Sequence, residues 1–249
     1  MESKSNFKDH FSSHAKLYAR NRPDYPQELF SYLNEITPDK STVWDCATGS
    51  GQAALSLCNY FEQVIATDAS RNQLRNAVQH AKIDYRVASA ESSGIEDHSI
   101  DLITIAQALH WFDHDKFYEE VRRVSKPETM IAAWSYGITQ IEPKIDQILL
   151  NYYENIVGPY WPSERHFIED QYKNIPFPFQ QLKNPSFAMK KIWNADDLLA
   201  YLRTWSATQK YIMDKGIDPT SIIEKPLKRI YQEERMVMWP IYLLAAKVN

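Results

Sequence analysis

Glycine and cysteine are both scarce in this chain of 249 residues, which also lacks long apolar runs. The two cysteines, Cys46 and Cys58, fall at an expected strand end and in an expected helix. Neither a disulfide framework nor a Cys-x-x-Cys zinc cluster is therefore expected. No stretch approaches the roughly 20 apolar residues of a membrane-spanning helix, and the first residues do not resemble a signal peptide. These features favour a cytoplasmic location.

An excess of basic residues is also absent, because 28 Lys and Arg stand against 32 Asp and Glu, for a formal net charge of −4. A nucleic-acid surface needs a basic stripe to neutralise phosphates. Hydrophobic residues make up 44% of the chain and charged residues 24%, which excludes wholesale disorder. We expect a globular protein that acts on a small molecule, with no nucleic acid and no membrane as a partner. No feature predicts an oligomeric state.

Short apolar runs alternate with segments of helical spacing in the first half of the chain. The strands expected there are residues 42–46, 63–68, 83–87, 99–106 and 129–134. Two more are expected at 187–193 and 236–248, with one helix between them that carries Leu198, Leu202 and Trp205. Strands separated by helices predict an α/β fold with a doubly wound, seven-stranded, mostly parallel, Rossmann-like sheet.

We expect one domain with four parts. Residues 1–40 are an N-terminal helical cover, and 41–137 are the cofactor-binding core. Residues 138–185, rich in aromatic residues and proline, are expected to form a helical and aromatic cap over the carboxyl edge of the sheet. The final strands and helix occupy 186–249. Within the core, Ser70 is expected to cap a helix whose buried face includes Leu74, Val78 and Ala81.

Two of the six glycines, Gly49 and Gly51, follow the first expected strand and stand one residue apart. Open α/β sheets bind ligands beyond the carboxyl ends of their strands, and glycine allows a tight turn and a close approach by a ligand. Asp68 ends the second strand, where a carboxylate can accept hydrogen bonds from both hydroxyls of a ribose. The pattern predicts a site for an adenosine-containing ligand; a tight turn without a ligand is the alternative.

Asp45, four residues before Gly49, helps to choose between two such ligands. Residues 49–54 also satisfy the G-x-G-x-x-A form of a dinucleotide site, so an NAD-dependent oxidoreductase is the main alternative. A negative side chain beside the loop opposes a pyrophosphate but suits the ammonium of an amino-acid moiety. Asp45 therefore favours S-adenosylmethionine over NAD.

On these residues the chain resembles the class I S-adenosylmethionine-dependent methyltransferases, and more narrowly their trans-aconitate methyltransferase-like branch. The family pattern is acidic-x-Gly-x-Gly-x-Gly; Ala47 replaces the first glycine, which is least disruptive if its φ is negative. Segments 18–26 and 239–247 are also similar to that branch. The resemblance implies S-adenosyl-L-methionine as the cofactor and these cofactor-binding residues: Tyr18, Arg22, Asp45, Ala47, Gly49, Gly51, Asp68, Ala69, Ser89, Ala90, Glu91 and Gln107.

Methyl transfer from a sulfonium is an in-line displacement, so the protein mainly aligns the acceptor and excludes water. A carboxylate acceptor, which the resemblance favours, needs no base, whereas a hydroxyl or an amine does. His110 is the candidate base, with a packing histidine as the alternative. The residues expected to line the acceptor site are His110, Trp111, Trp134, Tyr136, Arg203 and Trp205.

Three alternatives remain open at this stage. Arg165 in the cap is a second arginine suited to a substrate carboxylate, although surface arginines are common. The pairs His110–His114 and His10–His14 have chelating spacing but no third ligand, so no metal is expected. A non-catalytic binder of S-adenosylmethionine is the third alternative, and Ala47 is its only indication.

Overall fold

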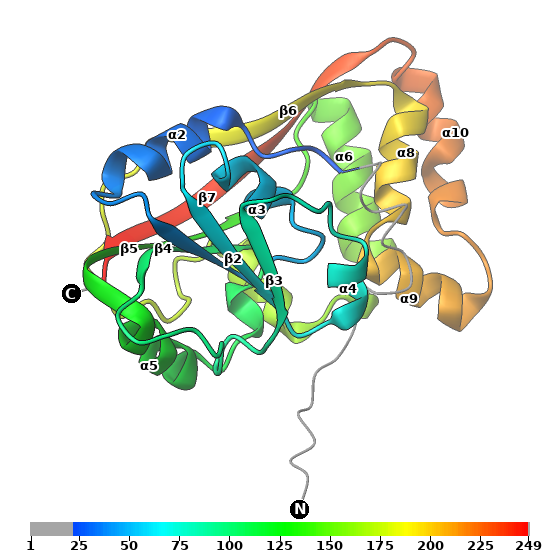
Figure 1. Ribbon diagram of the computed structural model, residues 1–249. Helices are drawn as coiled ribbons and strands as arrows, with labels where there is room; N and C mark the ends of the chain where they lie inside the picture. The colour runs from blue at the N-terminus through cyan, green and yellow to red at the C-terminus, as the bar shows by residue number, and fades with distance from the viewer. Residues whose placement is uncertain (1–21, 249) are drawn as a thin grey trace, which may run out of the picture.

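Seven strands form one sheet in the order β3-β2-β1-β4-β5-β7-β6 (Figure 1). The computed structural model describes residues 22–248. Strands β1 to β5 are parallel, whereas β7 runs antiparallel to both β5 and β6. The predicted doubly wound, mostly parallel sheet is confirmed. The strands are β1 Thr42–Cys46, β2 Gln63–Asp68, β3 Ile83–Val87, β4 Ile100–Ala106, β5 Ser125–Tyr136, β6 Phe187–Trp193 and β7 Arg235–Lys247.

Both faces of the sheet are covered, because consecutive residues of a strand belong to different hydrophobic cores. Val43 packs in the same core as helices α2 (Gln27–Ile36) and α3 (Gln52–Leu57). The next residue, Trp44, packs on the other face with α5 (His114–Val124). This two-sided burial explains why β4 is apolar along nearly its whole length.

Two junctions between strands and helices differ from the prediction. β5 begins at Ser125, directly after α5, so Pro127 lies within the strand, where a register shift interrupts the pairing with β4. Such an irregularity tolerates a residue without a backbone N–H. Helix α4 spans only Arg71–Arg75, and Val78, expected on its buried face, is 59% exposed. Ser70 does cap α4, since its side chain accepts a hydrogen bond from the backbone N–H of Gln73.

The cap comes from two segments of the chain rather than one. Three helices, not one, separate β6 from β7. The Thr204 hydroxyl donates to the Tyr201 carbonyl where α8 ends. Asp218 accepts hydrogen bonds from the backbone N–H and the hydroxyl of Thr220 at the start of α10. Figure 1 shows α6, α8, α9 and α10 gathered at one end of the sheet. These helices are α6 Pro143–Asn151, α8 Ala195–Arg203, α9 Ser206–Lys215 and α10 Thr220–Ile230.

Short helices complete the functional end of the molecule. A π-helical turn, η3 (Tyr152–Ile156), continues α6. Turns of 3-10 helix and one short α-helix follow: η4 Gly158–Tyr160, η5 Ser163–Arg165 and α7 His166–Glu169. On the sheet side, the 3-10 turn η2 (Leu109–Trp111) follows β4.

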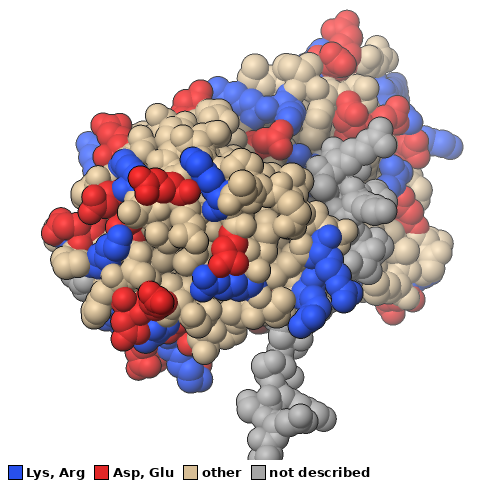
Figure 2. All heavy atoms as spheres, viewed as in Figure 1, with Lys and Arg blue, Asp and Glu red and all other residues tan. Residues whose placement is uncertain are grey.

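Several expectations from composition have structural counterparts. Cys46 and Cys58 are both buried free thiols. Basic and acidic side chains lie side by side on the face shown in Figure 2. Within residues 22–248, none of the helices has the length and apolar character needed to cross a membrane.

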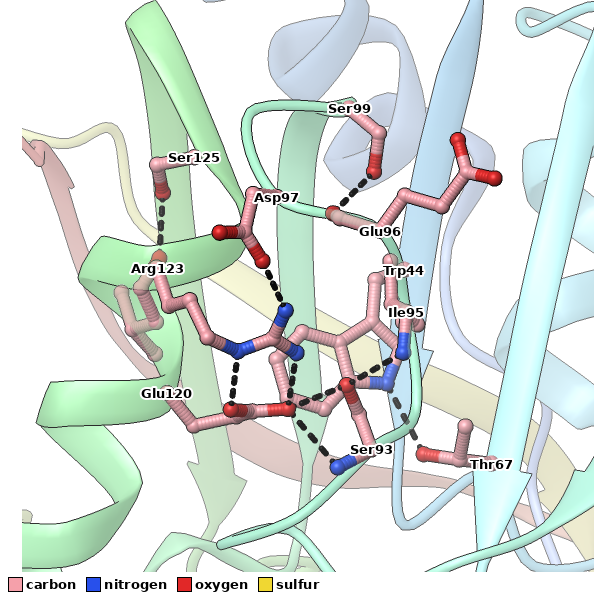
Figure 3. A network of polar contacts seen from close by, with 11 residues as sticks. Trp44, Thr67, Ser93, Ile95, Glu96, Asp97, Ser99, Glu120, Arg123 and Ser125 are labelled. Carbon is pink, nitrogen blue, oxygen red and sulfur yellow. Dashed lines mark hydrogen bonds and ion pairs between the residues drawn. The ribbon is translucent and has the colours of Figure 1, made fainter.

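A buried carboxylate on α5, Glu120, holds the loop that follows β3 (Figure 3). Its Oε1 accepts hydrogen bonds from the Ser93 backbone N–H at 2.8 Å and from the Ser93 hydroxyl at 2.5 Å. Arg123 donates to both oxygens of Glu120, at 2.7 and 2.8 Å. Burial alone would raise the pKa of Glu120, but the hydrogen bonds from Arg123 and Ser93 outweigh it and lower the pKa to about 2. The same loop carries three of the predicted cofactor-binding residues, Ser89, Ala90 and Glu91.

We expect Glu120→Gln to lower the free energy of unfolding at pH 7 by roughly 1.5–3 kcal/mol, the usual contribution of hydrogen bonds to a charged group. Because the pKa of Glu120 is about 2 in the folded chain and its ordinary value is 4.5, its stabilisation is complete above about pH 4.5 and is lost as the pH falls toward 2. Urea unfolding should therefore show a smaller difference between wild type and variant at pH 3 than at pH 7. Glu119→Gln, an exposed neighbour on α5, is the control. An equal difference at both pH values would contradict the lowered pKa of Glu120 in the folded chain.

Candidate active site

The ends of β1 and β4 meet at the centre of the sheet, where the strand order reverses. From β1 the chain proceeds to β2 on one side, and from β4 it proceeds to β5 on the other. Such a switch point leaves a crevice beyond the carboxyl ends of the two strands. Residues 47–51 follow β1 there, and Gln107 and η2 follow β4.

Asp45 in β1 is fully buried and bonds to the protein itself. Its Oδ2 accepts from the Thr48 hydroxyl at 2.5 Å and its Oδ1 from the Thr104 hydroxyl at 2.8 Å. Burial raises the pKa of Asp45 to about 6 despite these two hydrogen bonds. The carboxylate has no exposed surface, and its contacts join the loop to β4. Its predicted role toward an ammonium group stays a prediction. Its charge still favours a cation in the neighbouring crevice.

Asp68 at the end of β2 anchors the same loop from the other side. Its Oδ2 accepts from the Gly49 backbone N–H at 2.9 Å, and its Oδ1 accepts from the Ser70 N–H at 2.7 Å. These two bonds fix the carboxylate at the end of β2, beside the glycine loop. The predicted ribose contact is compatible with this geometry and stays a prediction.

The two glycines of the loop have different roles. Gly51 has φ +84°, and an added Cβ would lie 2.3 Å from the Tyr85 hydroxyl, so internal packing requires glycine there. Gly49 has φ +60°, and its missing side chain faces open space. Gly49 is therefore the position where the loop leaves room for a ligand.

Ala47 and Gln107 both adopt left-handed backbone conformations directly after β1 and β4, with φ +54° and +58°. The condition under which alanine would be the least disruptive replacement, a negative φ, is therefore not met at Ala47. A residue with a Cβ loses roughly 1–2 kcal/mol in this conformation. Strained residues of this kind concentrate at functional sites, where the surrounding structure holds them. Here the Gln107 N–H is held by the Trp134 carbonyl at 2.8 Å.

A cavity of about 660 Å³, its open mouth included, lies between the ends of β4 and β5 and the cap. It brings together six predicted residues, two from the cofactor set and four from the acceptor set. All its lining residues are Arg22, Gln107, His110, Trp111, Tyr136, Gly137, Ile138, Trp161, Pro162, Arg165, Ile168, Tyr201, Trp205 and Ser206.

Two residues expected to line the acceptor site lie elsewhere. Trp134 is fully buried in the core beneath α2, where its ring packs edge-on against Tyr25 and Phe30. Arg203, at the end of α8, pairs with Asp218 at 2.7 Å and ties α8 to the connection before α10. Trp134 shares its face of β5 with Tyr136, which lines the cavity, but it lies two residues before the end of the strand. Arg203 was misassigned because the two helices after α8 were not expected.

Sequence reasoning missed most of the cap side of the cavity. Trp161 and Tyr201 were not singled out, and Arg165 was only weighed beside Arg203. The concentration of aromatic residues and proline at 158–162 was the available signal. Arg165 lies 4.6 Å over the Trp161 ring. On the sheet side, Arg22 donates to the Tyr136 hydroxyl, and its guanidinium lies 6.0 Å from the centre of the Tyr201 ring.

His110 in η2 is buried, and its Nδ1 lies 2.9 Å from the Tyr172 hydroxyl. Burial, together with the positive charges of Arg165 and His114, lowers the pKa of His110 to about 3. The imidazole is therefore neutral near pH 7 and a much weaker base than an ordinary histidine. General bases work best with a pKa near the operating pH, so this geometry disfavours the expected base role.

The remaining predicted cofactor residues lie along the same crevice or outside the described part of the chain. Glu91 accepts a hydrogen bond from the Asp113 N–H at 3.2 Å, Ala90 is buried, and Ser89 and Ala69 are exposed. Tyr18 lies outside residues 22–248, as do His10 and His14. Within residues 22–248, no three His, Cys, Asp or Glu side chains are grouped to hold a metal ion.

We expect Ala47→Gly to raise the free energy of unfolding by roughly 0.5–1 kcal/mol, because glycine removes the left-handed strain at a smaller entropic cost. Ala54→Gly in α3 is the control and should destabilise by about 1 kcal/mol. Urea unfolding measures both changes, and titration with S-adenosylhomocysteine shows whether the loop still binds. A loss of stability in Ala47→Gly as large as that in the control would contradict the conformation of Ala47.

Comparisons with known proteins cover nearly the whole chain. Residues 44–133 match the family described as a methyltransferase domain. A protein of Dictyostelium discoideum named as a methyltransferase is 32% identical over 251 residues, which cover 97% of this chain and 95% of the relative. A structure of a type II methyltransferase from Anaeromyxobacter dehalogenans is 38% identical with a TM-score of 0.85, covering 91% of this chain and 98% of the other. A methyltransferase structure from Anabaena variabilis, 17% identical with a TM-score of 0.54 over 88% of this chain and 98% of the other, shows the fold alone.

These relatives resolve the alternatives that the glycine loop left open. An NAD-dependent oxidoreductase and a non-catalytic binder both fitted the loop by itself, but the similarity extends through the cap to the last strand. A methyl donor in this crevice is compatible with the open space beside Gly49. The chain belongs to the class I S-adenosylmethionine-dependent methyltransferases.

Proposed function

We propose that this chain transfers the methyl group of S-adenosylmethionine to a carboxylate oxygen of a small anionic molecule. The observation that carries the proposal is the charge of the cavity. Its lining within residues 22–248 includes two arginines, Arg22 and Arg165, and no carboxylate. The resemblance to the trans-aconitate methyltransferase-like branch points to the same class of acceptor.

The arginines favour an anion and oppose a cationic acceptor. Within residues 22–248, the contacts of Arg165 are two aromatic rings and a hydroxyl, with no carboxylate at ion-pair distance. A half-buried guanidinium in this setting retains donors that match a carboxylate in geometry and charge. A protonated amine in the same cavity would meet two like charges.

The weak basicity of His110 is also consistent with a carboxylate acceptor. A carboxylate is already ionised at neutral pH, whereas a hydroxyl or an amine must lose a proton. His110, with its pKa lowered to about 3, is poorly suited to take one. S-adenosylmethionine supplies a methyl group activated on a sulfonium. The carboxylate lone pair forms the O–C bond as the S–C bond breaks and its electron pair stays on sulfur, so no proton moves.

The residues of the chain orient the reactants and exclude water. Gly49, Asp68 and Gln107 would hold the donor at the switch point. The aromatic side chains form the wall on the acceptor side, and they are Trp111, Tyr136, Trp161, Tyr201 and Trp205. Fixing the two reactants in line removes most of the entropic barrier to the displacement.

Methyl-labelled S-adenosylmethionine tests the acceptor class directly. The purified chain is incubated with small carboxylic acids and with amides, alcohols and amines of the same skeletons. We expect label in the acids alone, as methyl esters that release labelled methanol in dilute alkali. Label in an alkali-stable ether or methylamine product, with none in the acids, would overturn the proposal.

His110→Asn should reduce kcat/KM by less than about tenfold, because loss of a general base typically costs 10²–10⁴-fold. The wild-type rate should also show no ionisation of His110 between pH 5 and 8, since its pKa is lowered to about 3 and the ring stays neutral throughout. Rates measured across this range with both proteins check the two statements. His114→Asn is the control, and a hundredfold loss confined to His110→Asn would restore the base role.

A further inference from the structure

We infer that Arg165 is the anchor for the acceptor's carboxylate, and that Tyr153 and Trp161 position its guanidinium for this purpose. The inference rests on the proposed function and adds the anion-binding residue and its supports. Arg165 is the last residue of η5 and lines the cavity from the cap side. The sequence offered Arg165 and Arg203 equally for this role, and Arg203 is instead paired with Asp218.

Three contacts fix the guanidinium of Arg165. It lies 4.6 Å from the centre of the Trp161 ring and 5.4 Å from that of Tyr153. Its Nε donates a hydrogen bond to the Tyr153 hydroxyl at 2.8 Å. Because Nε is already used, the donors left for an anion in the cavity are those of the two Nη groups. A fork of parallel N–H donors is the arrangement that binds a carboxylate most specifically.

Tyr153 is itself held in place, so it can act as a fixed support. It lies on the π-helical turn η3, is 8% exposed, and packs against Trp161 and Trp205. Its hydroxyl donates to Glu169 Oε1 at 2.6 Å while it accepts from Arg165. Burial raises the pKa of Tyr153 to about 12, so the hydroxyl keeps the proton that it donates to Glu169. π-Helical turns often occur at functional sites.

This relay orients Arg165 without neutralising it. Glu169 is separated from the guanidinium by the Tyr153 hydroxyl, so its negative charge supports the hydroxyl rather than occupying the arginine fork. A carboxylate directly on Arg165 would take the place of the substrate. The arrangement therefore provides a positioned cation whose remaining donors are left for a ligand.

The charge change of the reaction gives this anchor a second effect. The bound acid is an anion, whereas its methyl ester is neutral at the same group. Arg165 consequently binds the acid more tightly than the ester. The anchor favours release of the product as soon as the O–C bond has formed.

Benzoate is a suitable probe, because it combines a carboxylate with an aromatic ring that suits the cavity wall, and benzamide is its neutral analogue. Both are titrated into the full chain saturated with S-adenosylhomocysteine, and tryptophan fluorescence follows binding. We expect wild type to bind benzoate at least tenfold more tightly than benzamide. Tyr153→Phe should lose about tenfold in benzoate affinity alone, and Arg165→Gln should lose the preference for benzoate.

Tyr160→Phe is the matched control, since it also removes one hydroxyl from the cap, but its partner is Asp214. An unchanged dissociation constant for S-adenosylhomocysteine shows that each variant is folded. Equal affinity of wild type for benzoate and benzamide, or no effect of Tyr153→Phe, would overturn the anchor.

Kinetics separate the anchor from the proposed function. If acids are methylated and Arg165→Gln leaves their KM unchanged, the anchor is wrong and the proposed function stands. If benzoate binds through Arg165 but no acid is methylated, the anchor stands and the proposed function is wrong. A tenfold rise in KM for the acid in Tyr153→Phe, with kcat retained, supports both the anchor and the proposed function.

Discussion

The buried carboxylate of Asp45 is the interaction on which the site depends. A charge inside a protein is costly unless hydrogen bonds replace its hydration. Thr48 supplies one bond from the loop and Thr104 another from the neighbouring strand. The requirement to satisfy Asp45 therefore joins β1, β4 and the glycine loop at the one place where the strand order reverses. Asp68 completes the arrangement by holding the Gly49 N–H from β2.

The strained residues beside this carboxylate follow from the same constraint. β1 and β4 are paired in register up to Cys46 and Ile105, and both chains must then turn sharply to open a crevice. Ala47 and Gln107 make these turns with positive φ. Their conformational cost is offset by the buried sheet that surrounds them, since neither residue can relax without disturbing paired strands.

The sequence predicted what depends on local periodicity and little of what depends on tertiary packing. Alternating apolar runs located every strand, and the bounds of β6 match the prediction. The glycine spacing and Asp68 located the loop and its anchor. The cap was different, because its boundaries depend on turn contacts such as those of Thr204 and Asp218. The proposed role of Arg165 depends on two aromatic rings that meet its guanidinium, Tyr153 of η3 and Trp161 between η4 and η5, and no spacing in the sequence predicts these contacts.

For the proposed carboxylate acceptor, the aromatic wall and the arginines address one electrostatic problem together. A displacement between an anion and a sulfonium destroys both charges, so it proceeds more readily when water is excluded and the local dielectric is low. Aromatic walls such as Trp161 and Trp205 provide that exclusion, but by themselves they would also repel the acceptor anion from the cavity. A guanidinium held over one of those walls offsets the loss of hydration without admitting water. The cap thus places its cation where the dry environment that speeds the reaction would otherwise prevent binding.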